Sequence, residues 1–215
     1  LENLNIARWN DQFIQFDDYD HGAIDETLRW TIVKDSGAAA AIVADARSGE
    51  LNLTSANTTD NDGASIQGKQ EYFSLPSTAG NKLYYETRIK MSDVDQMDVL
   101  VGLTETFTTN PENALASSNI IGFLLTDGSA VIAGVTEASD TATTVTLDTT
   151  LSTLTNDTYV TLGFVATKAN SDGNNKVDFY INRKYAGTST TNIPTANMKM
   201  MAMSVSGDAT GQKVT

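Results

Sequence analysis

The sequence predicts an all-β fold, an antiparallel two-sheet β-sandwich or jelly roll, and three observations support this prediction. No window repeats apolar residues with the 3.6-residue period of an amphipathic helix, whereas alternation with a period of two recurs along the chain. The 30 threonines favour strands, and the 17 asparagines, 16 serines and 15 glycines favour the turns between them. About a dozen short candidate strands separated by such turns are typical of sandwiches and jelly rolls.

The candidate strands before residue 82 are short, and clusters of Asp, Asn, Ser and Gly separate them. They are residues 28–33, 39–44, 50–54, 65–67 and 72–75. Residues 82–90 then give the clearest pattern. Leu83, Tyr85, Thr87 and Ile89 occupy one face of this strand, and polar residues with Tyr84 occupy the other.

The middle and the end of the chain supply the remaining candidate strands. Residues 159–166 and 176–182 alternate as 82–90 do, which predicts one buried and one exposed face. Residues 99–103, 120–125 and 198–205 are apolar on both faces. We expect these three to be central strands, covered on one side by the other sheet and on the other by a loop or a partner. Weaker candidates are 130–135 and 143–147, and residues 136–156 are read as a strand with long polar flanks.

Composition excludes several classes of function. The 215 residues include no cysteine and one histidine, which removes thiolate metal sites, disulfide scaffolds and most histidine metal sites. The formal net charge of −13 argues against nucleic-acid and anionic-membrane partners, because phosphate contacts need clustered Lys and Arg. No apolar run reaches the length of a membrane span. We expect residues 1–215 to form a single domain, with residues 1–24 as an N-terminal arm and no cofactor.

Paired carboxylates are the first catalytic hypothesis, since glycoside hydrolysis needs two carboxyl groups about 5–9.5 Å apart. The candidates are Asp93, Asp95 and Asp98, but they lie in a stretch that reads as the loop before residue 99. We therefore interpret them as a solvated turn, and a glycan-degrading enzyme stays the least favoured alternative. Asp60–Asn61–Asp62–Gly63 is likewise interpreted as a turn rather than as part of a calcium site.

The first 20 residues contain a second acidic group and a cluster of aromatic residues. Asp17, Asp18 and Asp20 offer oxygens to an adventitious cation, and His21 beside them is interpreted as a surface or interface residue. Trp9, Phe13, Phe16 and Tyr19 are the candidate partner-contact residues of the arm, which we expect to pin it to the sandwich or to another subunit. Tyr84, Tyr180 and Tyr185 are expected on outward faces or loops, where rings stack on sugars in sugar-binding sandwiches.

Two resemblances follow from motifs. The segment Lys-Leu-Tyr-Tyr-Glu-Thr-Arg-Ile-Lys-Met at residues 82–91 resembles the Tyr-x-Glu-x-Arg-Ile-Lys strand of concanavalin A-like lectin/glucanase sandwiches, including family 16 glycoside hydrolases. That resemblance implies the fold. The Glu-x-Asp-x-x-Glu strand that carries the nucleophile and the acid in those enzymes has no counterpart in residues 97–105. Catalytic equipment of that family is therefore not expected.

A second resemblance covers most of the chain. Its motifs run in one order, and the order is similar to that of lectin-like structural proteins that decorate or cement the capsids of tailed bacteriophages, especially marine and cyanobacterial phages. The motifs are Gly-Glu-Leu-Asn-Leu-Thr at 49–54, Thr-Asp-Asn-Asp-Gly at 59–63, Ile-Gln at 66–67, Tyr-Glu-Thr-Arg at 85–88, Val-Gly-Leu at 101–103, Ile-Gly-Phe at 121–123, Leu-Gly-Phe at 162–164, Val-Asp-Phe-Tyr-Ile at 177–181 and Asn-Ile-Pro at 192–194.

The second resemblance implies a non-enzymatic virion structural protein, made in the host cytoplasm and located on the outer capsid surface. Its expected partners are the major capsid protein and copies of itself, in a homo-oligomer for which a trimer is one option. Nucleic acid and membrane are not expected as partners. The alternative is a carbohydrate-binding, lectin-like module of a phage fibre or spike.

Overall fold

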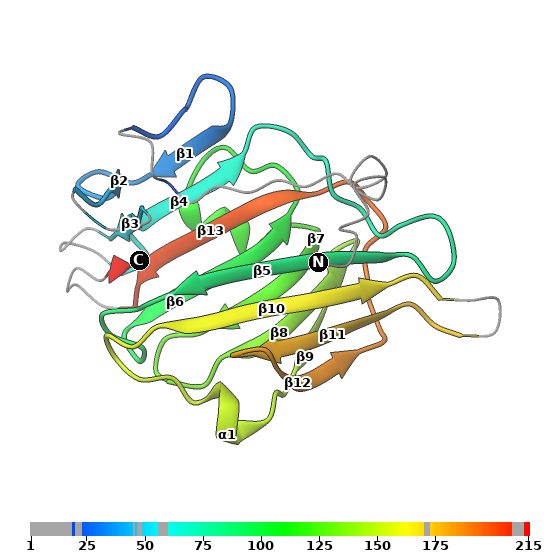
Figure 1. The fold of residues 1–215 in the computed structure, drawn as a ribbon. Coiled ribbons are helices and arrows are strands. Elements are labelled where there is room, and N and C mark those ends of the chain that lie inside the picture. The colour runs from blue at the N-terminus through cyan, green and yellow to red at the C-terminus, as the bar shows by residue number, and fades with distance from the viewer. Residues whose placement is uncertain are drawn as a thin grey trace, which may run out of the picture.

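The computed structural model describes residues 19, 23–44, 46, 49–55, 60–169, 173–207 and 213–215. The described chain is almost entirely antiparallel β-structure in two packed layers (Figure 1). One layer is a seven-stranded sheet of order β1-β4-β13-β6-β7-β8-β9, and the other contains a four-stranded sheet of order β12-β11-β10-β5. The predicted all-β sandwich is therefore confirmed.

The strands follow the sequence prediction closely. In the seven-stranded sheet they are β1 (Trp30–Lys34), β4 (Gly63–Gly68), β6 (Met97–Thr104), β7 (Asn119–Leu125), β8 (Ala133–Ala138), β9 (Thr141–Val145) and β13 (Lys199–Ser206). In the four-stranded sheet they are β5 (Lys82–Ile89), β10 (Val160–Thr167), β11 (Lys176–Ile181) and β12 (Lys184–Ser189).

The four-stranded sheet has one buried and one exposed face, as the alternation predicts. Val177, Phe179 and Ile181 of β11 are fully buried, whereas the residues between them are partly exposed. The inward faces of β5, β10 and β11 meet those of β6 and β7 in the main hydrophobic core, where the Phe123 ring makes an edge contact with Phe179. Burial of this shared face holds the two sheets together.

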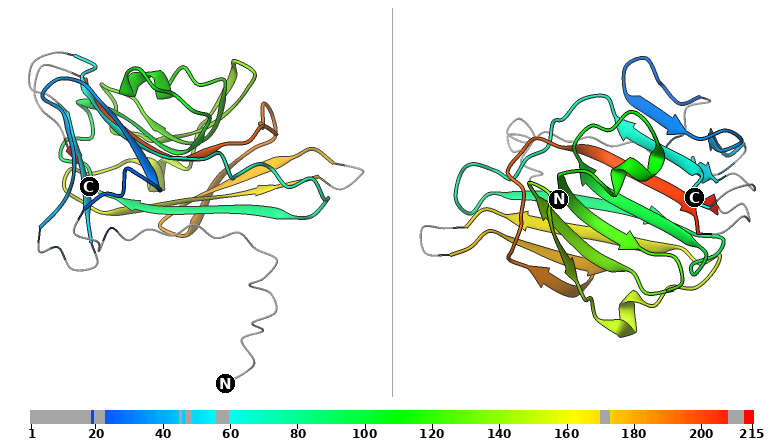
Figure 2. Two further views of the ribbon diagram at one scale, coloured as in Figure 1. Left: turned by 90° about the horizontal axis from the view of Figure 1, so that it is seen from above. Right: turned by 180° about the vertical axis from the view of Figure 1, so that it is seen from behind.

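The seven-stranded sheet is covered on both faces, which confirms the prediction for the doubly apolar strands. Its outer face carries a second buried cluster that includes Leu100, Ile120 and Met203. Residues 105–118, with the short 3-10 helix η2 (Pro111–Ala114), lie over this face and bury Phe107 and Ala114 in the cluster (Figure 2, left). The cover is thus a loop of the chain itself.

A third, small sheet extends the four-stranded layer. It consists of β14 (Lys213–Val214), β3 (Leu51–Thr54) and β2 (Ala39–Ile42). Val214 forms a bridge with Met91, and Thr215 and Lys90 exchange two backbone hydrogen bonds, so the small sheet joins the end of β5. Leu53 of β3 packs with Trp30 and Ile66 in a third buried cluster between the layers.

Three elements differ from the sequence prediction. β12 has no counterpart among the candidate strands. Residues 136–156 contain the end of β8, all of β9 and the single-turn helix α1 (Thr149–Ser152) rather than one strand. Asp148 begins α1 because its side chain accepts a hydrogen bond from the Thr150 amide. Of residues 72–75, only Phe73 forms a bridge, to Met198. No helix in the described ranges has the length and apolar character needed to cross a bilayer.

Candidate functional site

The outer face of the four-stranded sheet is the candidate site. We define this face as the outward side chains of β5, β10, β11 and β12, with the adjoining Tyr159, Lys90 and Arg183. The strand pairing arranges it in rows that run across the sheet. The middle row consists of Glu86 on β5, Gly163 on β10, Tyr180 on β11 and Tyr185 on β12. Tyr84, Val165, Asp178 and Thr188 form the neighbouring row.

The middle row combines a glycine with two packed aromatic rings. Gly163 has no side chain and is itself buried, and Glu86 and Tyr180 flank it on the neighbouring strands. The Tyr180 and Tyr185 rings pack edge to face with centroids 6.0 Å apart, which fixes both rings against the sheet. Tyr185 is 58% exposed, so most of its ring is free to contact a ligand.

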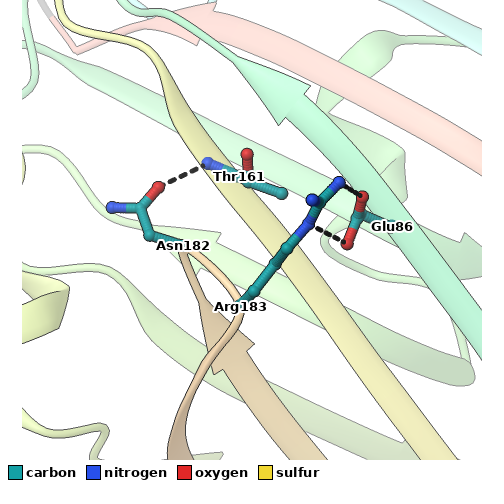
Figure 3. A network of polar contacts seen from close by, with 4 residues as sticks. All are labelled: Glu86, Thr161, Asn182 and Arg183. Carbon is teal, nitrogen blue, oxygen red and sulfur yellow. Dashed lines mark hydrogen bonds and ion pairs between the residues drawn. The ribbon is translucent and has the colours of Figure 1, made fainter.

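Arg183 lies in the turn between β11 and β12, and its side chain extends to Glu86 of the middle row (Figure 3). Asn182 and Arg183 both have positive φ, 50° and 63°, the backbone of a tight two-residue hairpin. Asn182 pairs with Thr161 of β10, and Arg183 reaches across β10 to Glu86 with Nη2–Oε1 and Nε–Oε2 distances of 2.9 and 3.3 Å. This two-point pair keeps the guanidinium and the carboxylate in one plane above the sheet.

A second aromatic group lies at the same end of the sheet. The Arg88 guanidinium carbon is 4.2 Å from the centroid of the Tyr159 ring, and Lys90 Nζ is 4.9 Å from it. Both are cation–π distances. The Tyr159 hydroxyl donates a hydrogen bond to Glu50, and burial followed by this bond raises the pKa of Tyr159. The two cations are thereby held on the outer face.

Asp178, the second carboxylate of the outer face, also has polar partners. Asp178 lies 2.7 Å from Lys176 Nζ and accepts a hydrogen bond of 2.6 Å from Thr188. The hydrogen bond with Asp178 raises the pKa of Lys176, so this lysine stays charged at neutral pH. Glu86 and Asp178 therefore act as positioned hydrogen-bond acceptors between cations.

The carboxylates proposed for catalysis occupy turn positions. Asp93 and Asp95 lie in the loop before β6, where the Asn156 side chain accepts a bond from the Val94 amide and donates one to Asp93. A hydrogen bond with Asp95 raises the pKa of Asp93. Asp98 lies inside β6, not in the loop as expected, and accepts the Asp127 amide at 2.8 Å. These side chains order turns at one end of the seven-stranded sheet.

The predicted cation and arm residues fall mostly outside the described ranges. Asp17, Asp18, Asp20, His21, Trp9, Phe13 and Phe16 all lie outside them. Residues 60–63 form a turn, in which Asn61 and Asp62 exchange backbone hydrogen bonds with Ser206. In the described ranges no three His, Asp or Glu side chains are grouped so that they could hold a metal ion.

Tyr19 is the one predicted arm residue that the structure places. Its ring is tilted against Trp30 with centroids 5.8 Å apart, beside the inter-sheet cluster. The two residues line part of a pocket of about 480 Å³ that extends between the layers to Tyr85 and Met200. Tyr19 thus packs beside Trp30, and the role of the arm stays a prediction.

Comparison with known proteins defines the class of fold. No family model and no curated protein matches the sequence. The solved structures that resemble it include an endo-1,3-β-glucanase from Streptomyces sioyaensis, with 12% identity, 92% of this chain and 91% of that chain covered and a TM-score of 0.62. The β-glucanase of Bacillus licheniformis has 15% identity, 92% coverage of each chain and a TM-score of 0.57.

A non-enzymatic structure gives a comparable match. The potassium-bound carbohydrate recognition domain of Emp46p has 9% identity, covers 86% of this chain and 85% of its own, and has a TM-score of 0.56. The chain therefore has the concanavalin A-like lectin/glucanase sandwich fold that residues 82–91 implied. At these identities the similarity establishes the fold alone.

Sequence reasoning placed part of the site. Alternation along 82–90 and 176–182 correctly put Tyr84 and Tyr180 on the outer face. It missed the Arg183–Glu86 pair, which joins residues 97 positions apart. The usable signal was the polar pair Asn182–Arg183 between two alternating segments, since Asn tolerates positive φ and marks hairpin turns.

Proposed function

We propose that this chain is a non-enzymatic structural protein of a tailed-phage virion that binds the major capsid protein on the outer capsid surface. We propose further that it acts as a homo-oligomer. The cover formed by residues 105–118 is the observation that supports a non-enzymatic role. It buries Phe107 and Ala114 against the outer face of the seven-stranded sheet, so this part of the face is closed to a substrate.

The cover is fixed by hydrogen bonds as well as by apolar contacts. Buried Gln67 donates a hydrogen bond to the carbonyl of Phe107 and accepts one from its amide. Glu71 accepts bonds from the amide and the hydroxyl of Thr106. Because satisfied buried polar groups are costly to separate, the cover is a permanent part of the fold rather than an opening lid.

The virion part of the proposal is supported by the ordered motifs of the second resemblance. Within the described ranges these motifs fall on strands of both layers, among them β5, β6, β7, β10 and β11. The acidic composition also suits a position outside the packaged DNA. We assign the capsid contact to the arm of residues 1–24, whose Tyr19 packs beside Trp30.

Binding to empty capsids tests this proposal. We expect the purified protein to co-sediment with empty capsids assembled from the major capsid protein of the same phage, and to raise their resistance to heat. The triple variant Trp9→Ala, Phe13→Ala and Phe16→Ala should bind at least tenfold more weakly, because aromatic anchors dominate interface energetics. The variant Tyr72→Ala is the control, since Tyr72 is 59% exposed on the sandwich itself. Absence of co-sedimentation by the unaltered protein would reject the capsid role.

Carbohydrate binding is the second candidate function, and the middle row of the outer face favours it. The rings of Tyr180 and Tyr185 lie on one side of the buried Gly163, and Glu86, paired with Arg183, lies on the other. Such a row can stack a sugar ring and hydrogen-bond its hydroxyl groups. On a glycan array we expect saturable binding that Tyr180→Ala or Tyr185→Ala abolishes and Tyr72→Ala leaves intact.

A further inference from the structure

Charge is distributed unevenly between the outer face and the rest of the chain. Residues 82–90, 160–168 and 176–189, which form the four-stranded sheet and its immediate ends, contain seven of the 14 Lys and Arg residues. They contain two of the 27 Asp and Glu residues, so these segments have a net charge of +5. The remaining seven cations and 25 carboxylates give the rest of the chain −18. These segments are therefore basic within a strongly acidic protein.

The cations of this face lie in two groups at opposite ends of the strands. Lys82 and Lys176 share one row through Thr167 of β10, and Lys168 follows that strand. Arg88 shares the row of Thr161 at the other end, near Lys90 and Arg183. Lys82 and Arg88 are six positions apart along β5, a length of about 20 Å. Tyr84, Tyr180, Tyr185 and Gly163 lie between the two groups.

We propose that this outer face binds a single chain of an acidic polysaccharide, laid along the strands. Its uronate or sulfate groups contact the two cation groups, and its sugar rings pack on the tyrosines between them. The proposal rests on the carbohydrate-binding candidate, whose ligand class it names, and it is independent of the capsid role. Clustered Lys and Arg with aromatic side chains are the composition expected of a polyanion site.

The size of the face favours a polysaccharide over an acidic protein. Four strands about 4.8 Å apart span about 14 Å, so the face covers on the order of 300 Å². A stable protein interface needs about 800 Å² from each partner and would extend over the surrounding acidic surface. Because the Debye length is about 8 Å at physiological salt, those carboxylates would repel an acidic protein. A single glycan chain keeps its charges over the basic strip.

The carboxylates within the face favour a polysaccharide over a single-stranded nucleic acid. Glu86 and Asp178 lie between the cations in the central rows. Both accept hydrogen bonds, which sugar hydroxyls can donate and phosphodiester groups cannot.

Heparin, which carries uronate and sulfate groups, is the probe for this site. We expect saturable binding of a heparin oligosaccharide that weakens as the salt concentration rises. Heparin that has been desulfated and carboxyl-reduced should bind at least tenfold more weakly. The double variant Lys82→Glu and Arg88→Glu removes one cation at each end and should lower the heparin affinity at least tenfold. The matched control, Lys34→Glu with Lys69→Glu, changes the net charge equally outside the face and should retain binding.

Thermal unfolding confirms that each variant is folded before its affinity is compared. The inference is wrong if the heparin affinity of both double variants falls equally, because binding then depends on the total charge of the protein rather than on this face. Equal binding of heparin and its neutral form rejects the acidic ligand but preserves the carbohydrate-binding candidate. Absence of binding to both rejects the inference and the candidate together. Tighter binding of oligo(dT) than of heparin identifies a nucleic acid as the occupant and also overturns the proposal.

Discussion

The outer faces of the two main sheets differ, because one is covered by a loop and the other is exposed. The seven-stranded sheet is covered by residues 105–118, and Phe107 of this cover is only 7% exposed. The four-stranded sheet leaves its outer face open, and Tyr84 there is 67% exposed. Both sheets share the same inner core, so core packing does not require this difference. The covered face stabilises the fold, and the open face is available for binding.

The surroundings of the carboxylates also differ between the two sheets. Asp98 near Asp127 and Asp60, and Glu137 near Asp140 and Glu105, place like charges around the seven-stranded sheet. On the open face, in contrast, Glu86 and Asp178 are each paired with a cation. Substitutions at the covered sheet should therefore affect stability, and substitutions on the open sheet should affect binding.

The largest effect is expected from Phe107→Ala. Removing this ring leaves a cavity between the cover and β4, β6 and β13, and we expect the free energy of unfolding to fall by about 3 kcal/mol. Urea denaturation measures this loss. Tyr84→Ala is the matched change on the open face and should stay within about 0.5 kcal/mol of the unaltered protein. Equal losses for the two variants would contradict the division between covered and open sheets.

Gln67→Leu should have the next largest effect. The amide and the carbonyl of Phe107 both lose their partner, while the apolar surface of the cluster is kept. Leaving these groups unpaired should cost about 2 kcal/mol in the same denaturation experiment. Gln70→Leu, at an exposed position three residues later, is the control and should be nearly neutral. A neutral Gln67→Leu would mean that water replaces the lost bonds and that the cover is not sealed.

Asp98→Asn tests the charge of the covered sheet. Burial, and then the charges of Asp127 and Asp60, raise the pKa of Asp98, so its charged form destabilises the native state. The stability that this raised pKa contributes is fully present below the pKa of Asp98 in the unfolded chain. It is lost as the pH rises through the raised pKa of Asp98 in the native state. We expect Asn to raise Tm at pH 7 by about 1–2 °C, since the group is half exposed and screened, and to have no effect at pH 3. Thermal scans at both pH values measure the difference, and an equal gain at both would point away from charge.

The smallest effect on stability is expected from Arg183→Ala. The Arg183 and Glu86 side chains are 79% and 51% exposed, and pairs of this kind contribute little to stability. The melting temperature should stay within about 1 °C, but heparin affinity should fall several-fold because one cation of the open face is removed. Arg183→Lys keeps the charge and should retain part of the affinity. A large loss of Tm would show that the pair is structural and would weaken the comparison.

The sequence predicted most of the fold because short-range patterns determine which residues face the core. Alternation located β5, β10 and β11, and doubly apolar runs located the covered strands β6, β7 and β13. β12 was missed because Asn182–Arg183 lacks the glycine that usually marks a two-residue hairpin. The site was harder to predict. Lys82 and Lys176 become neighbours only through the register of β5, β10 and β11, which no local pattern specifies.

The position of β13 has a consequence for how this sheet assembles. Among the described strands β13 is the last but one in sequence, yet it lies inside the seven-stranded sheet, between β4 and β6. During synthesis β4 and β6 therefore present unpaired edges until residues 199–206 leave the ribosome, and such edges invite aggregation. We expect slow folding that is completed only after this strand is made, as is usual for contacts distant in sequence. A chain shortened to residue 198 should bind a hydrophobic dye and aggregate, and a soluble, cooperatively folded fragment would contradict this.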